Sequence, residues 1–159
     1  MKNITVLIAD DHMIVREGLK HLLQSAADIE VVGEAQTGEA AVHAARKLRP
    51  HVVLLDIAMP IINGIEAARQ IHKHVPSVGI LILSTYHEDQ EVRLAIEAGA
   101  QGYLMKESAS AELLTAVRAV KAGQSYFSPA ISGRMARQTR GSVFEQRGTC
   151  DGGSGSDRA

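Results

Sequence analysis

Residues Ile4–Asp11, with the sequence ITVLIADD, decide the fold, because a six-residue run of mainly apolar and β-branched residues is followed at once by two aspartates. Unbroken apolarity over so short a run is typical of a strand buried on both faces, as in a parallel sheet covered by helices. Similar runs are Val52–Leu55 (VVLL) and Ile80–Leu83 (ILIL), and two weaker runs resemble strands nearer the edges, Val31–Ala35 and Gly102–Met105. The sequence therefore predicts five strands.

Amphipathic segments separate these strands. Apolar residues recur at helical spacing at Val15, Leu19, Leu22 and Ala26, and again at Leu113, Val117 and Val120. Asp11 and Thr37 are predicted helix N-caps, and Asn63 with Glu66 three residues later resembles a capping box. The predicted helix ends are marked by Pro50, Pro76, Gly99 and Gly123.

The alternation of strands and helices predicts an α/β fold, a (βα)5 unit with a doubly wound, five-stranded parallel sheet. In such sheets ligands bind beyond the carboxyl ends of the strands. That rule directs the search for a functional site to the residues that follow each strand.

Length and composition fit one such domain, predicted at residues 1–127 of the 159. Residues 128–159 are predicted to form a short helix-like segment (128–137) and a flexible Gly/Ser-rich tail, without a complete helix-turn-helix domain. With 3% aromatic residues the chain has few rings for stacking on single-stranded nucleic acid. Cys150 is the one cysteine, and neither a secretory signal nor a membrane-spanning run is present, so we expect a cytoplasmic protein without membrane contact.

Polar residues with chemical potential follow the strongest strands. Asp10 and Asp11 follow the first strand, Asp56 the third, Ser84 the fourth and Lys106 the fifth. Adjacent parallel strands lie about 4.8 Å apart, so these side chains are expected to converge on one pocket.

Three carboxylates in one pocket repel one another unless a cation compensates their charge. The hard oxygen ligands, without a nearby cysteine, favour Mg²⁺ over Zn²⁺. Lys106 would supply a further positive charge and Ser84 a hydroxyl donor for a phosphoryl oxygen. Asp56 is then placed to act as a nucleophile, the role of carboxylates in aspartyl-phosphate chemistry.

The set of motifs, in order along residues 3–122, resembles the receiver domain of bacterial response regulators. The motifs are Asp10-Asp11, Asp56-Ile-Ala-Met-Pro with Gly64, Ser84-Thr85-Tyr86, and Gly102-Tyr103-Leu-Met-Lys106. The segment GAQGYLMKE and the helix-like segment after residue 127 further resemble the LuxR-type subfamily. The resemblance implies a flavodoxin-like strand order of 2-1-3-4-5.

The resemblance also implies the role of each residue. Asp56 would accept a phosphoryl group from a sensor histidine kinase, with Lys106 and Ser84 contacting that group. Mg²⁺ would be held by Asp11 and Asp56, by Asp10 directly or through water, and by the backbone carbonyl of Ala58. Ser84 and Tyr103 would be the switch residues.

The resemblance further implies a signalling switch of a two-component system rather than an enzyme. A homodimer is possible, and DNA binding is expected of a full-length relative but not of this chain. Ala58 and Tyr86 would flank the path of the hydrolytic water, so we predict slow loss of the phosphoryl group.

Other interpretations compete with this one. A pseudo-receiver would keep the fold as an interaction or dimerisation module without phosphotransfer, but the complete set of acidic and basic residues argues against it. A haloacid dehalogenase-type hydrolase needs a DxDx[TV] motif after the first strand, which Asp10-Asp11-His12-Met13 lacks. A flavodoxin-like cofactor binder needs a phosphate-binding first loop. Taken singly, Asp10 and Asp11 could be helix caps and Lys106 a surface charge, and the seven histidines are predicted to be scattered surface residues.

Overall fold

The computed structural model describes residues 3–59, 61–85, 89–129 and 131. It divides into a unit of residues 1–128 and a second unit of residues 129–159. The predicted helix-like segment and tail fall almost entirely outside the described residues, as does Tyr86. The description below concerns the first unit.

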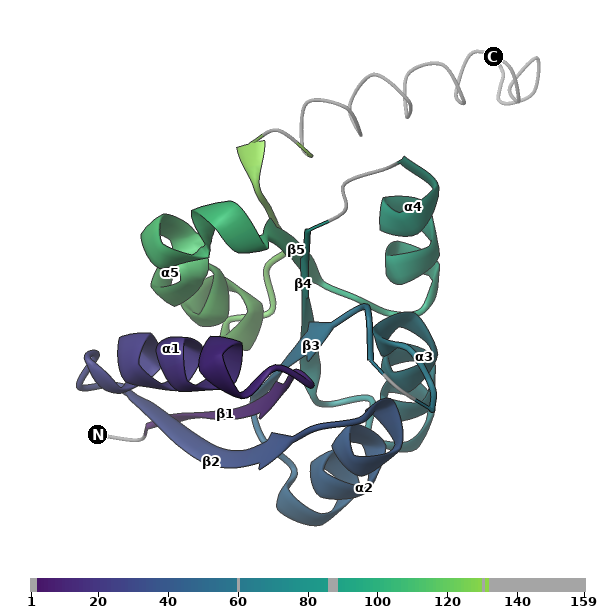
Figure 1. Cartoon of the computed structure of the whole chain (residues 1–159), viewed down its shortest axis with the longest axis horizontal. Coiled ribbons are helices and arrows are strands. Elements are labelled where there is room, and N and C mark those ends of the chain that lie inside the picture. The colour runs from purple at the N-terminus through teal and green to yellow at the C-terminus, as the bar shows by residue number, and fades with distance from the viewer. Residues whose placement is uncertain (1–2, 60, 86–88, 130, 132–159) are drawn as a thin grey trace. The chain divides into compact units, whose positions relative to one another are not determined.

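A six-stranded parallel sheet forms the centre of this unit, with the strand order β2-β1-β3-β4-β5-β6 (Figure 1). The strands are β1 (Ile4–Ala9), β2 (Ile29–Ala35), β3 (Val52–Asp56), β4 (Gly79–Ser84), β5 (Gly102–Met105) and β6 (Tyr126–Phe127). The predicted doubly wound α/β fold and the order 2-1-3-4-5 are confirmed. The sixth strand was not predicted, because its two residues are too few to leave a periodic pattern.

Helices cover both faces of the sheet. They are α1 (Met13–Gln24), α2 (Gly38–Leu48), α3 (Gly64–His74), α4 (Asp89–Glu97) and α5 (Ala109–Lys121), with a short 3-10 helix, η1 (Lys106–Ser108), before α5. Figure 1 shows α1 and α5 on one face and α2, α3 and α4 on the other. Each helix therefore connects two parallel strands by a crossover, as the alternating pattern requires.

The core lies between these layers. Every residue of β3 and β4 is buried, as their continuous apolar sequence predicts for strands covered on both faces. On one face the strands pack against Leu19 and Leu23 of α1 and Leu113 and Val117 of α5. A rigid sheet thus holds the residues that follow its strands.

Two predicted N-caps are confirmed and one is wrong. The Thr37 side chain accepts a hydrogen bond from the backbone N–H of Ala40, and that of Asn63 accepts one from Glu66. The N-cap of α1 is His12 rather than Asp11, and no side-chain hydrogen bond caps this helix. The sequence pattern failed here because the two aspartates are directed to the pocket at the end of the sheet.

The edge strand β2 begins at Ile29, two residues before the predicted start. Its second residue, Glu30, is exposed, which interrupted the apolar run in the sequence. Among the described helices, none has both the length and the apolar character that crossing a bilayer requires.

Candidate functional site

Strand register brings the predicted site residues to one edge of the sheet. Ala9 pairs with Leu55, so Asp10, which follows β1, lies beside Asp56, the last residue of β3. One strand further, Ser84 of β4 pairs with Met105 of β5, the residue before Lys106. The predicted convergence at the carboxyl ends of the strands therefore rests on hydrogen-bonded register.

The charged side chains meet in a buried cluster. The Lys106 Nζ atom lies 3.0 Å from Oδ2 of Asp10 and 3.2 Å from Oδ2 of Asp56. Both carboxylates are almost fully buried, whereas Asp11 is partly exposed at the entrance. One ammonium group thus faces two buried carboxylates, which leaves the cluster short of positive charge.

The pKa of Asp56 reflects this shortage. Burial raises the pKa of Asp56, the nearby Asp10 carboxylate raises it further, and Lys106 offsets only part of the increase. For Lys106, burial lowers the pKa, but the interactions with the Asp10 and Asp56 carboxylates outweigh this effect, so the net pKa is raised. The lysine therefore stays charged, whereas the ionised form of Asp56 is destabilised.

The donor set fits a hard divalent cation. Oδ2 of Asp10 and Oδ2 of Asp56 are buried atoms without a hydrogen-bond partner, although Lys106 lies at ion-pair distance from both. Asp10, Asp11, His12 and Asp56 each offer a ligand atom, and these four atoms lie within 4.8 Å of one another. Buried carboxylate oxygens without a hydrogen bond, beside a partly exposed third carboxylate, match the oxygen ligands and retained waters that Mg²⁺ prefers.

The loop after β3 supports Asp56 through close backbone contacts. The backbone of Ala58 donates a hydrogen bond to the Asp56 carboxylate, which favours the charged form. Gly64, at the start of α3, packs so tightly that a Cβ atom there would lie 2.3 Å from the Asp56 carbonyl oxygen. Between them Ile61 has φ = 73°, a left-handed conformation that costs a β-branched residue free energy. Ile61 therefore adds local backbone strain to the described part of this loop.

Ser84 and Tyr103 lie where the sequence predicts them. Ser84 is the buried last residue of β4. Tyr103 is fully buried in β5, so its ring points inward. Their movement as switch residues, like the metal-binding role of the Ala58 carbonyl, stays a prediction.

Sequence reasoning missed the part that Arg16 plays. This arginine of α1 is buried and donates a hydrogen bond of 2.7 Å from Nη1 to the backbone carbonyl of Asp10. Its Nε atom donates to Glu34 of β2, which also accepts a hydrogen bond from Lys20. Arg16 therefore fixes the backbone that carries the first carboxylate. No motif signals this role; only the helical phase that turns Arg16 toward the strand ends could have revealed it.

His12 was also missed as a neighbour of the cluster. Its backbone N–H donates to Oδ1 of Asp10, and its ring Nδ1 lies 3.1 Å from Oδ1 of Asp11. The ring is 66% exposed, so the prediction of a surface histidine is correct, although its contact with the aspartates was not predicted. Its position directly after two aspartates was the available signal.

Comparisons with known proteins agree with this geometry. The sequence profile of the response regulator receiver domain matches residues 6–118. The response regulator protein VraR of Staphylococcus aureus (strain Mu3) is 39% identical over 132 residues, which cover 83% of this chain and 63% of VraR. The chain thus spans less than two thirds of the length of this curated relative.

Two solved structures show the same fold. A two-component response regulator of the LuxR family from Aurantimonas sp. SI85-9A1 is 34% identical, with a TM-score of 0.83 over 87% of this chain and 99% of that one. The RcsB response regulator of Salmonella typhimurium, solved in a study of its conformational dynamism for DNA interaction, is 30% identical. Its TM-score is 0.76 over 83% of this chain and 66% of that one.

Proposed function

This chain belongs to the response regulator receiver domain family, and from that premise we propose that it is a switch that accepts a phosphoryl group on Asp56 from a sensor histidine kinase. Response regulators are signalling proteins of two-component systems, and receiver domains bind Mg²⁺ at an acidic pocket. The observation that carries the proposal is that Asp10, Asp56 and Lys106 meet in one buried cluster, in which a single ammonium faces two carboxylates.

In the proposed reaction a carboxylate oxygen of Asp56 attacks the phosphorus of a phosphohistidine. An O–P bond forms as the N–P bond breaks, and the histidine nitrogen keeps the electron pair and later takes up a proton. The other Asp56 oxygen remains available as a ligand. Asp10, Asp11 and Asp56 would hold Mg²⁺. The bound ion would supply positive charge to the phosphoryl oxygens.

Lys106 is proposed to compensate the charge that arrives with the phosphoryl group. Phosphorylation brings about −1.5 to −2 charges and strong acceptor oxygens. The Lys106 ammonium already lies at ion-pair distance from the acceptor oxygen, so it can pair with the new group without rebuilding the site. Ser84, at the end of the adjacent strand, would donate a hydrogen bond to a phosphoryl oxygen.

The output of the switch is proposed to be a rearrangement of the region from β4 to β5, with Ser84 and Tyr103 as its moving parts. A change from mostly inactive to mostly active takes a few kcal/mol of differential stabilisation, which metal contacts and charge-assisted hydrogen bonds can supply. The chain covers only 63% of VraR. Control of transcription by a longer protein and dimerisation are therefore proposed by analogy alone. RcsB, a relative whose dimers have been solved on DNA, supports that analogy.

A direct test uses a small phosphodonor. The full chain is incubated with Mg²⁺ and acetyl phosphate, and intact mass is compared between the wild type and Asp56→Ala. One added phosphoryl group on the wild type and none on the variant is the expected result. Labelling that persists in the variant would remove Asp56 from the mechanism.

A further inference from the structure

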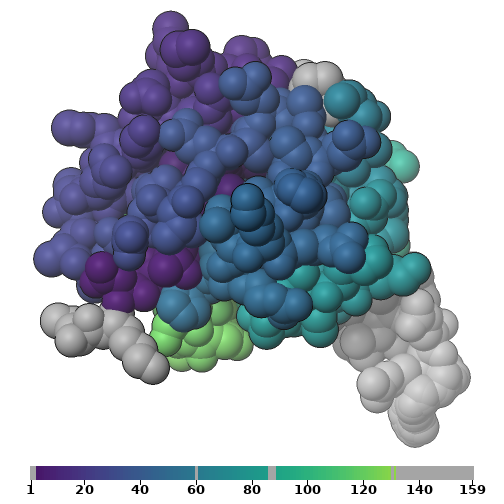
Figure 2. All heavy atoms as spheres, turned by 90° about the horizontal axis from the view of Figure 1, so that it is seen from below, coloured from purple at the N-terminus to yellow at the C-terminus, as the bar shows by residue number. Residues whose placement is uncertain are grey.

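A second charged site lies away from the acidic cluster, in a hollow of about 520 Å³ beside the carboxyl-terminal ends of α2 and α3. Its lining consists of five basic side chains and one apolar one, namely His43, Arg46, Lys47, Arg49, His74 and Val75. Figure 2 shows α2 in blue at the surface of the molecule, with teal residues, the colour of α3, beside it. Pockets of this volume hold small ligands, but an apolar ligand would find only Val75 here.

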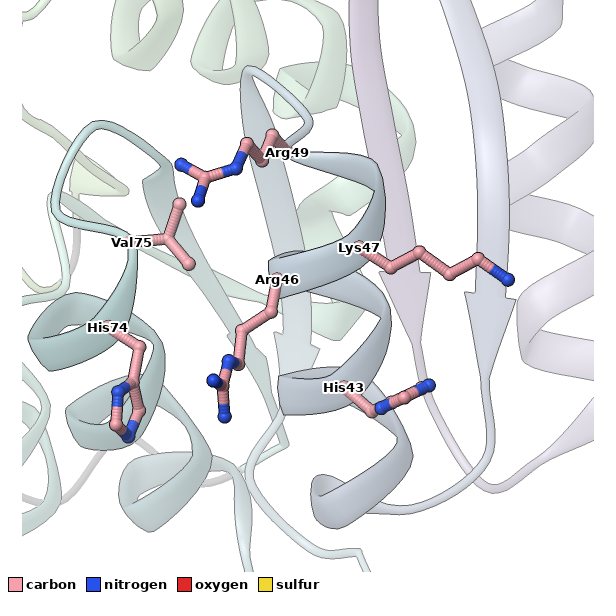
Figure 3. A pocket seen from close by; sticks show the side chains of 6 residues that line it. All are labelled: His43, Arg46, Lys47, Arg49, His74 and Val75. Atoms are coloured by element: carbon pink, nitrogen blue, oxygen red, sulfur yellow. The ribbon is translucent and has the colours of Figure 1, made fainter.

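The basic groups of this hollow are exposed, and none of them has a carboxylate partner among the described residues. Within the described part of the chain, none of the five side chains makes an ion pair or a side-chain hydrogen bond, whereas Arg16, Lys106 and Arg118 each face a carboxylate. In Figure 3 the Arg46 side chain lies between the two helices, Arg49 extends past the end of α2 toward Val75, and His74 lies at the end of α3. His43 and Lys47 extend from the opposite side of α2, away from α3.

Helix chemistry accounts for only part of this arrangement. Arg46 and Lys47 lie in the last turn of α2, where cations are favoured because a helix C-terminus carries about half a negative charge. Two helix ends therefore offset about one unit of charge, against three from Arg46, Lys47 and Arg49. A net positive potential remains in the hollow.

Arg49 is the second observation that points to a ligand. It caps α2 in a left-handed conformation, with φ = 47° and ψ = 59°. Glycine or asparagine usually occupies such a position, because a Cβ atom is disfavoured there. Arg49 departs from this preference. Its guanidinium lines the hollow and makes no ion pair or hydrogen bond with another described residue, so no such contact compensates for the strained backbone.

We propose that this hollow binds a small anion carrying at least two linked phosphate groups. Guanidinium groups match phosphate oxygens with paired N–H donors, and Arg46 and Arg49 supply two such groups from the same helix end. The volume exceeds the need of a single phosphate, and the absence of a carboxylate from the described lining removes a source of repulsion. The site would act independently of phosphorylation at Asp56.

The test is calorimetric titration of the full chain with inorganic tripolyphosphate at 0.15 M salt, with EDTA to keep divalent cations away from the acidic cluster. At this ionic strength, weak attraction to scattered surface charges is largely screened. Arg46→Gln combined with Arg49→Gln is expected to raise the dissociation constant by at least about tenfold. Lys121→Gln, which removes one charge at the exposed end of α5 and is matched to the single variant Arg49→Gly below, is expected to change it by less than about twofold.

Arg49→Gly separates binding from folding. Glycine suits the left-handed conformation, so this variant is expected to melt at the same or a higher temperature while binding tripolyphosphate more weakly. Three results would overturn the proposal: no binding of tripolyphosphate, an equal loss in Lys121→Gln, or preferential binding of poly-glutamate, which would assign the hollow to an acidic protein partner.

Discussion

The Lys106 ammonium lies 3.2 Å from Oδ2 of Asp56 although Lys106 follows β5, Asp56 ends β3, and β4 separates these two strands. The same nitrogen lies 3.0 Å from Asp10, which follows β1. One side chain therefore connects the ends of three strands, and it does so through charges that are largely removed from water.

Removing that ammonium is expected to destabilise the fold. Lys106→Met leaves Asp10 and Asp56 buried without a cation, and loss of one partner of a buried ion pair costs about 3 kcal/mol. The measurement is urea unfolding at pH 7 without divalent cations. Lys121→Met, which removes an exposed lysine without an ion pair among the described residues, is the control and is expected to stay within about 0.5 kcal/mol of the wild type. Equal losses in the two variants would show that the Lys106 ion pairs contribute nothing.

Replacing the acceptor carboxylate should have the opposite effect. Burial and the Asp10 carboxylate raise the pKa of Asp56, so its ionised form is less stable in the folded chain than in the unfolded one. Asp56→Asn is therefore expected to increase the free energy of unfolding at pH 7 by about 1–2 kcal/mol in EDTA. Adding Mg²⁺ should raise the melting temperature of the wild type and leave that of the variant almost unchanged. If Asp56→Asn is less stable than the wild type in EDTA, the inference that two buried carboxylates exceed the charge of Lys106 is wrong.

The fold could be predicted because its strands and helices each leave a pattern within a short stretch of sequence. Strands β3 and β4 are buried on both faces, which leaves apolar runs that a single sequence displays. The acidic cluster could be predicted for the same reason, since Asp10 follows β1 and Asp56 ends β3, and these two strands are neighbours in the sheet.

What escaped prediction depends on packing between distant segments. Arg16 approaches Asp10 only because α1 presents that side of its surface to the strand ends, and hydrophobic spacing alone does not show it. The basic hollow is lined by Arg46 and Arg49 of one segment and His74 of another. The packing of α2 against α3 brings these segments together, and no sequence motif connects them. The strand β6 has two residues and gains its structure from pairing with β5.

The Arg16 network gives a pH-dependent prediction through Glu34. The Lys20 hydrogen bond lowers the pKa of Glu34, burial opposes this and Arg16 lowers the pKa further, so the net shift is downward. A lowered pKa in the folded state contributes stability above the unfolded value, near 4.3, and loses it as the pH falls through the folded value. Glu34→Gln is expected to cost about 1 kcal/mol at pH 7 and less at pH 3. Urea unfolding at both pH values checks this, and a penalty that does not change with pH would contradict it.

Two glycines offer a matched pair of substitutions near the site. A Cβ atom at Gly64 would lie 2.3 Å from the Asp56 carbonyl oxygen, whereas one at Gly18 of α1 would meet no atom within 4 Å. Gly64→Ala is expected to destabilise the chain by about 2–3 kcal/mol and to reduce labelling by acetyl phosphate. Gly18→Ala should stabilise it by about 0.5–1 kcal/mol, because alanine favours a helix interior, and should leave labelling unchanged. Equal effects of the two changes on stability would show that the close contact at Gly64 is relieved without cost.

The lifetime of the proposed phosphoryl group gives the last prediction. Ala58 is exposed two residues after Asp56, and Tyr86, which lies outside the described residues, follows Ser84 by two. By the family resemblance both positions flank the approach of the hydrolytic water; alanine cannot position that water, and a tyrosine ring can shield the phosphoryl group. Ala58→Asn combined with Tyr86→Ala is therefore expected to shorten the acyl-phosphate lifetime about tenfold, since orienting a nucleophile contributes strongly to rate. Intact mass followed over time after removal of acetyl phosphate measures the decay. Should the double variant decay at the wild-type rate, these two side chains do not control access of water, and the slow hydrolysis predicted from them is wrong.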